Sequence, residues 1–257
     1  MTAFYEPLGD GVFRSTVHTT GPWSPLTQHL GPPSALLVRA LEELPSAAPM
    51  TIARVTVEIL GPVPIAPLTV SATVDRPGRS VEMVSASLSA DGREVVRARA
   101  WRVVRSDSRA VAFDIDAPLP PPSEGRPTGR PDGWGAGYLD VMEWRALSGA
   151  LGVPGPACVW VRQTVPLVAG ESPSGLQRLF VVADSGNGVS NRLDPRKWLF
   201  INAELSVHVY RVPDGEWIGL DAATAIGADG VGVASAVLHD LSGPVGRGAQ
   251  ALLVRPQ

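Results

Sequence analysis

Two polar residues near the end of the sequence stand where an apolar side chain is expected. Thr224 in GLDAATAIG shares a strand face with Leu220, Ala222 and Ile226, and Gln250 in RGAQALLVR shares one with Leu252 and Val254. A buried hydroxyl or amide needs a hydrogen-bond partner. The two side chains could bond each other, the nearby Glu204, or a water molecule held between them, and a held water next to a carboxylate could do hydrolytic chemistry.

Each of these residues also has a purely structural interpretation. Thr is common in strands and can bond the backbone, and a core Gln can bridge two backbone segments. Glu204 lies in NAELSVHVYR, where Asn202, Ser206 and His208 are polar at the same spacing. Strict alternation predicts a half-buried strand whose polar face, Glu204 included, is in water.

Other chemistries lack their motifs. The sequence has no GxSxG, no HExxH and no Cys-x-x-Cys, and the glycine-rich GADGVGVAS runs into a predicted strand instead of opening a helix. Cys158 is the single cysteine, and the four histidines show no metal-ligand spacing. Covalent and metal-dependent mechanisms are therefore poorly supported.

The chain divides at a segment rich in proline and glycine, residues 116–135, which we interpret as a linker between residues 1–115 and residues 136–257. Each half has one helical segment followed by four strands. The first half has a helix over 35–44 and strands over 51–60, 67–78, 80–92 and 94–104, with a tight turn at Asp91 and Gly92. The second half repeats this order, with Ser172 as a helix cap.

A long helix followed by strands that wrap it, repeated once, predicts an α+β protein with two helix-wrapping antiparallel sheets, that is, a double hotdog. Two unrelated α+β modules are the alternative. The net charge of −3, without charge runs, gives no sign of nucleic-acid or membrane binding. No secretory signal or apolar run long enough to span a membrane is seen, so we expect a cytoplasmic protein.

The second half, from Asn202 to Pro256, together with QHLGPPSALLVRALE in the first half, resembles the type II acyl-CoA thioesterases, in particular an actinobacterial branch called thioesterase family proteins. The resemblance implies a hydrolase in which an acidic residue, a hydroxyl and an amide hold the water that attacks a thioester. Carried over by position, these are Glu204, Thr224 and Gln250. Better-studied members have Asp where Glu204 stands, and the added methylene puts turnover in question.

The resemblance also suggests where the substrate lies. The thioester oxygen needs hydrogen-bond donors, which helix N-termini supply. We favour the helix that begins near Gly31 and Ser34 over the one near Ser174 and Gly175, and expect Gln28 and His29 at its start to contact substrate. Coenzyme A enters as part of the substrate and no other cofactor is required. Its phosphates would meet basic residues of the NRLDPRKW segment, Arg192, Arg196 and Lys197.

Three further expectations remain open. We expect a homodimer or higher homo-oligomer. Hydration of enoyl-CoA is disfavoured, because Val189 stands five residues after Asp184, where that chemistry has His in its own branch of the fold. A non-catalytic acyl-CoA-binding protein, or a purely structural protein with no tunnel to Glu204, would fit the same sequence pattern.

Overall fold

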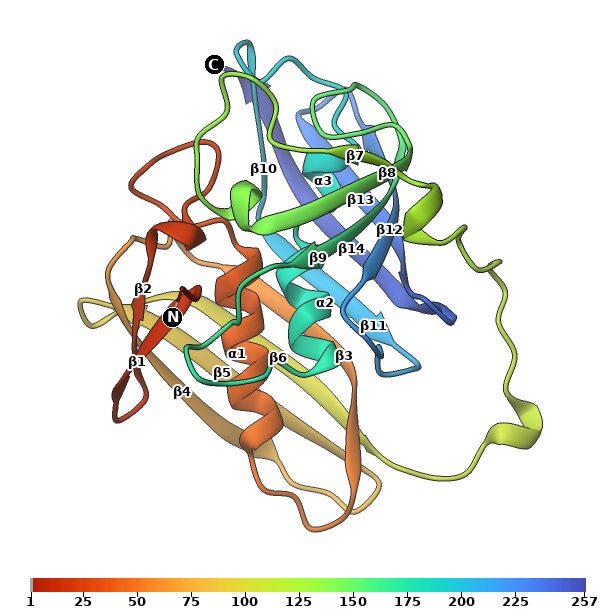
Figure 1. The fold of residues 1–257 in the computed structure, drawn as a ribbon. Helices are drawn as coiled ribbons and strands as arrows, with labels where there is room; N and C mark the ends of the chain where they lie inside the picture. Colours follow the sequence, from red (N-terminus) through yellow and green to blue (C-terminus); the bar gives the residue numbers. More distant parts are fainter. Residues whose placement is uncertain (1) are drawn as a thin grey trace.

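The computed structural model describes residues 2–257, and its strands form one antiparallel sheet that runs through both halves of the chain (Figure 1). The strands of the first half are β1 (Tyr5–Gly9), β2 (Val12–Ser15), β3 (Met50–Ile59), β4 (Pro67–Arg76), β5 (Val81–Ala90) and β6 (Arg93–Val104). The strands of the second half are β7 (Arg126–Thr128), β8 (Met142–Ser148), β9 (Ala157–Gln163), β10 (Trp198–Asn202), β11 (Glu204–Val209), β12 (Ile218–Ile226), β13 (Val231–Asp240) and β14 (Gly243–Pro256).

The strand order repeats outward from the middle of the sheet. From the centre, one side runs β3, β6, β5, β4, β2, β1 and the other β11, β14, β13, β12, β9, β8, β7. The halves join where β3 pairs with β11, with Val55 opposite Val207. The predicted α+β double hotdog is confirmed, and the pairing of β3 with β11 merges the two expected sheets into one.

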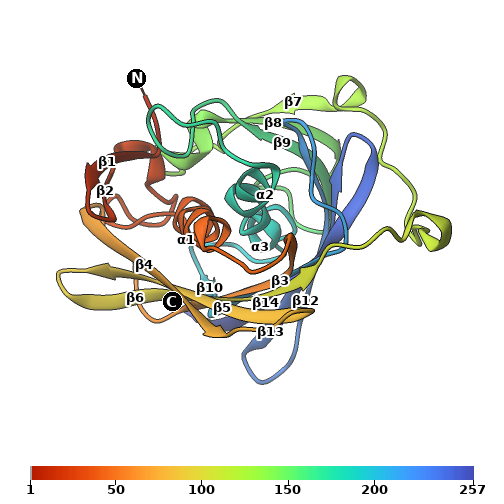
Figure 2. The ribbon, with the colours of Figure 1, turned by 90° about the horizontal axis from the view of Figure 1, so that it is seen from below.

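The helices lie in the hollow of the curved sheet (Figure 2). They are α1 (Gly31–Glu43), α2 (Gly175–Ala183) and the short α3 (Gly186–Val189), with single 3-10 turns η1 (Val17–Thr19), η2 (Arg109–Val111), η3 (Pro122–Glu124) and η4 (Tyr138–Val141). None of the described helices is long and apolar enough to cross a membrane.

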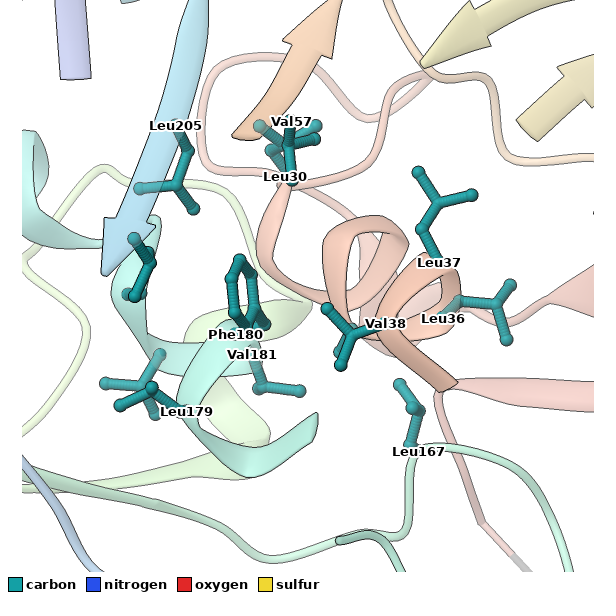
Figure 3. Packing of buried hydrophobic residues seen from close by; sticks show 14 of the residues in the cluster. Leu30, Leu36, Leu37, Val38, Val57, Leu167, Leu179, Phe180, Val181 and Leu205 are labelled. Atoms are coloured by element: carbon teal, nitrogen blue, oxygen red, sulfur yellow. The ribbon is translucent and has the colours of Figure 1, made fainter. Parts of the chain in front are cut away.

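The start of α1 crosses α2 at very short range. A Cβ atom on Gly31 would lie 2.2 Å from the Val181 carbonyl oxygen, so only glycine fits at this contact. Figure 3 shows Val38 and neighbouring residues of α1 facing Phe180 and neighbouring residues of α2, with Leu205 of the sheet alongside. This packing places the first residues of α1 next to the last turn of α2.

Several local predictions can be compared with the structure. The turn between β5 and β6 is confirmed, since Asp91 and Gly92 both have positive φ, 48° and 75°. The cap of the second helix was predicted wrongly: Ser174, not Ser172, accepts the hydrogen bond from Gln177 N. Part of the 116–135 segment is ordered against the second half, since it contains β7.

Candidate active site

Asp184 lies at a break in the second helix and points into the protein. It follows the last residue of α2 and precedes α3, and it is 5% exposed. Gln250 of β14, itself 2% exposed, bridges this break. Its Nε2 donates to the Asp184 main-chain oxygen and to Asp184 Oδ1, both at 3.1 Å, and its Oε1 accepts from Asn187 N at 2.9 Å. Gln250 therefore holds both ends of the helix break and the carboxylate between them.

Asn202, the last residue of β10, is the second amide on this carboxylate. Its Nδ2 donates to Asp184 Oδ1 at 2.9 Å. The two amides from two neighbouring strands thus occupy the same oxygen of Asp184. The other oxygen, Oδ2, faces the first half of the chain.

A β-bulge decides which residues of the alternating stretch face this site. β11 pairs Ser206 with Ala249 of β14, whereas β10 pairs Asn202 with Leu252, so β10 and β11 have one residue more than the strand opposite. Because directly paired residues share a sheet face, Asn202 lies on the helix-facing side with Leu252. The expectation that Asn202 and Glu204 share one face is therefore wrong.

Glu204 lies on the outer side of the sheet, where local groups bind its carboxylate. Oε1 accepts from Ala251 N and Oε2 from Ser206 Oγ, both at 2.8 Å. Among the described residues no hydrogen bond joins Glu204 to Thr224 or Gln250. The expected convergence of the three residues is not found, because Glu204 alternates with the buried Leu205 and Val207 and therefore points to the opposite face of the sheet.

Thr224 does lie on the same inner face of the sheet as Gln250, with β13 between their two strands. Thr224 pairs with Ala234, which pairs in turn with Gln250. Its hydroxyl lies 2.6 Å from Ser190 Oγ. Since Ser190 Oγ donates to the Gly186 carbonyl oxygen at 2.8 Å, Thr224 must be the donor in this contact. Thr224 therefore secures the end of α3.

His29 brings the first half of the chain to Asp184. Its Nδ1 lies 3.3 Å from Asp184 Oδ2, and its ring stacks on Tyr138 with the ring centres 3.8 Å apart and the planes at 6°. Burial lowers the pKa of His29, and the nearby Asp184 carboxylate opposes this shift. Because the ordinary histidine pKa is already near 6.5, the imidazole is neutral at pH 7.

The other residues predicted to bind substrate serve the structure at the start of α1. Gly31 N donates to His29 Nδ1 at 3.1 Å, and Ser34 N donates to the Leu30 carbonyl oxygen at 2.9 Å. Pro32 and Pro33 between them have no N–H. Gln28 is buried, with Oε1 accepting from Tyr5 Oη and Nε2 donating to the Pro64 carbonyl oxygen, both at 2.7 Å. Of the hydrogen-bonding groups at this helix start, the buried Ser34 hydroxyl is the one without a partner.

A pocket of about 1010 Å³ is lined by Phe200 and Ile201, the two residues that precede Asn202 in β10. Its aromatic wall comes from three separate segments: the Trp23 ring centre lies 5.1 Å from that of Trp134 and 5.6 Å from that of Phe200. Arg192 and Arg196, two of the predicted phosphate contacts, also line it. Phe200 precedes Asn202 by two residues in β10, so the wall of the pocket continues along the strand to the amide that binds Asp184.

The sequence comparisons identify the same two halves. A model of the acyl-CoA thioesterase N-terminal domain matches residues 19–103, and a model of the C-terminal domain matches residues 121–254. The chain belongs to the acyl-CoA thioesterase family. Comparison with curated proteins gave no match.

Solved structures share the fold of this family member at low sequence identity. A hotdog protein of unknown function from Alicyclobacillus acidocaldarius is similar over 97% of this chain and 95% of its own, with a TM-score of 0.75 and 15% identity. A proposed thioesterase from Novosphingobium aromaticivorans is similar over 98% of this chain and 99% of its own, with a TM-score of 0.74 and 19% identity. A proposed thioesterase II from Thermobifida fusca is similar over 98% of this chain and 95% of its own, with a TM-score of 0.72 and 17% identity. At these identities the similarity supports the fold.

Sequence reasoning missed Asp184 and Asn202. The alternating pattern places Asn202 on the solvent face, and no motif in the sequence marks Asp184. A signal for Asp184 is present: it is directly followed by Ser-Gly-Asn-Gly at the end of an amphipathic helix, a composition that favours a helix break. Nothing in the alternation of apolar and polar residues indicates the bulge that turns Asn202 inward.

Proposed function

We propose that the protein hydrolyses acyl-CoA thioesters at the cluster centred on Asp184. The observation that carries this proposal is a buried carboxylate held by two side-chain amides, from Gln250 and Asn202. Asn202 directly follows residues of β10 that line the aromatic pocket. Family membership supplies the substrate class.

The chemistry follows from a fixed negative charge next to a thioester carbonyl. Asp184 takes a proton from the water whose oxygen bonds to the thioester carbon; the carbon–sulfur bond then breaks, and the departing thiolate takes up this proton. The amides of Gln250 and Asn202 hold the carboxylate in one orientation. An aligned reacting group contributes strongly to rate, because the enzyme has already met the entropic cost of bringing it into place. Gln250, predicted from the sequence, keeps its place in this proposal, while the acidic role passes from Glu204 to Asp184.

The pocket gives the substrate a place to bind. The pantetheine arm and acyl chain fit among Trp23, Trp134 and Phe200, and Arg192 and Arg196 provide positive charge for the phosphates. Arg196 is bonded to Asp194, with Nε 3.1 Å from Oδ1, so it must exchange this partner for a phosphate. We expect Lys197, next in the chain, to add to the positive charge.

A non-catalytic acyl-CoA-binding protein is the second candidate. It is favoured by one observation: among the described residues, the pocket lining includes neither Asp184 nor Gln250. Binding in the pocket could then occur without contact to the carboxylate.

Thiol release from a series of acyl-CoAs of increasing chain length distinguishes the two candidates. A hydrolase releases thiol with saturation kinetics, and Asp184→Asn lowers kcat by about 10²-fold or more. Asp221→Asn, an exposed aspartate on β12, is the matched control and retains activity. Tight binding of an acyl-CoA without thiol release would support the second candidate and contradict the first.

A further inference from the structure

We propose that the outer sheet face of the second half binds a second copy of the chain, and that residues 109–115 of each copy cover one end of this face on the other. We call residues 109–115 the arm. The contact goes beyond the proposed hydrolysis and does not depend on it.

The outer face of the second half is apolar across four strands. One row runs from Ile201 of β10 through Leu253 of β14 to Val231 of β13, since these residues are paired directly. All three are exposed, at 41%, 46% and 61%. The next row consists of further exposed apolar residues, Ala251, Val233 and Ala225. Because an antiparallel sheet with one solvated face has polar residues on that face, we expect this apolar face to be covered.

The outer face of the first half is polar at the matching strands. Ser71 of β4 bonds Ser87 of β5 at 2.9 Å, and Ser85 of β5 donates to Asp75 at 2.7 Å. Arg97 of β6 pairs with Ser87 on the same face. Since the two halves have the same strand order, the apolar outer face is a property of the second half and not of the fold.

The arm is the other exposed apolar surface of the chain. Three large apolar side chains alternate along it and are 75%, 81% and 75% exposed, Val111, Phe113 and Ile115. The arm follows β6 and stands away from the body of the protein (Figure 1). The chain returns to the sheet where Arg247 Nη2 of β14 donates to Asp116 Oδ2 at 2.5 Å. The arm is therefore attached at the outer face near the beginning of β14.

A two-fold axis brings the arm and the apolar face together twice. Two sheet faces can pack on each other about an axis that lies between them and crosses the strands, and this axis sets the beginning of β14 in one copy over its end in the other. With the axis near Ala249, the arm beside Arg247 lies over Leu253 of the second copy. Because β11 and β10 pair with the same side of β14, it also lies over Ile201.

The surfaces are large enough for a specific dimer. Four strands about 4.8 Å apart, over five residues of about 3.3 Å each, present a flat area on the order of 300 Å². Phe113 adds about 150–250 Å² and the two aliphatic side chains of the arm add more. Each copy thus contributes on the order of 600 Å², or about 1,200 Å² in total, the lower limit for stable interfaces.

Charge and pocket position agree with this arrangement. Asp114 of the arm and the exposed Arg255 at the end of β14 have opposite charges, and the same axis brings them close together. Ile201 also lines the pocket described above. The arm of one copy therefore lies at the rim of the pocket of the other.

Sedimentation equilibrium measures the contact without any substrate. Wild type should have a mass of at least two chains of 27.0 kDa. We expect Phe113→Asp and Leu253→Asp each to weaken self-association by about 100-fold or more, because each change puts a charge into the apolar contact. Val81→Asp is the matched control, since Val81 is 40% exposed on the outer face of β5 in the first half. A wild-type mass of one chain, or an association that neither change weakens, overturns the proposal.

Disulfide cross-linking tests the two-fold arrangement itself. In a Cys158→Ser background, Phe113→Cys combined with Ile201→Cys should give covalent dimers on mild oxidation. Within one chain the two positions lie toward opposite ends of β14, about 20 Å apart, which is too far for a disulfide. Phe113→Cys combined with Val81→Cys is the control and should remain a single chain on a non-reducing gel. Equal cross-linking of both pairs, or none in the first, contradicts the arrangement.

Other outcomes identify another occupant or separate the contact from the proposed function. A wild-type protein that stays monomeric and binds vesicles of phosphatidylcholine and phosphatidylglycerol would assign the apolar face to a lipid surface and overturn the proposal. If wild type dimerises as described but releases no thiol from any acyl-CoA, the proposed function fails and the dimer contact stands.

Discussion

Replacing Gln250 by leucine tests whether this amide holds the helix break, because leucine is similar in size and makes no hydrogen bond. Three contacts are lost: the one from Asn187 N to Oε1 at 2.9 Å, and those from Nε2 to the Asp184 main-chain oxygen and to Asp184 Oδ1, both at 3.1 Å. Each buried group left without a partner costs about 1–3 kcal/mol, and Asn202 still bonds one of them. We therefore expect the free energy of unfolding to fall by about 3 kcal/mol, which is large against a typical total of about 5–15 kcal/mol.

The assay is urea unfolding followed by circular dichroism, with the midpoint and the slope compared between variants. Gln163→Leu is the matched control. Gln163 is also buried, but it makes one hydrogen bond, from Nε2 to the Val165 carbonyl oxygen at 2.8 Å, so its loss should cost about 1 kcal/mol. If Gln250→Leu costs no more than Gln163→Leu, Gln250 does not hold the Asp184 turn and the reasoning is refuted.

Three further variants test other parts of the structure. Arg102→Ala should lower the free energy of unfolding by about 3–5 kcal/mol in urea titrations, because it leaves the buried Glu82 without its ion-pair partner. Arg109 is exposed, so Arg109→Ala should leave the free energy of unfolding unchanged. Gly31→Ala should cost at least about 1–3 kcal/mol by the same measurement, since its Cβ would meet the Val181 carbonyl oxygen, and an unchanged midpoint would contradict the close crossing of α1 and α2. Trp23→Ala should raise KM for acyl-CoA about two- to tenfold with kcat unchanged, whereas Trp217→Ala, outside the pocket lining, should not.

The fold could be predicted because its signals are local and repeated. The helix of the first half and its four strands follow apolar spacing, and Asp91–Gly92 marks the hairpin turn between β5 and β6. The strands between Gly135 and Ala169 were missed, because β8 and β9 lie in a stretch with dense glycine and proline and no repeat partner of clear pattern. The pairing of β3 with β11 depends on contacts between the halves, which no local pattern contains.

The site could be predicted only in part, because one extra residue between β10 and β11 shifts their register against β14. Alternation identified Gln250 and Thr224 as inward-facing polar residues, and both are buried. The same rule places Glu204 correctly on the outer face but fails at Asn202, because the one-residue bulge between them turns Asn202 inward. Asp184 lies at the helix break. Its partners come from β14, β10 and the start of α1, three segments that are far apart in the sequence, so no local pattern connects them.

The choice between Asp184 and Glu204 as the acidic residue is tested most directly by comparing kcat for acyl-CoA hydrolysis in Asp184→Asn and Glu204→Gln. Both changes replace a carboxylate by an amide of the same shape, one at the helix break on the inner side of the sheet and the other on the outer face of β11. We predict a loss of about 10²-fold or more for Asp184→Asn, and a kcat within about threefold of wild type for Glu204→Gln. The opposite result, an active Asp184→Asn and an inactive but folded Glu204→Gln, would contradict the site described above.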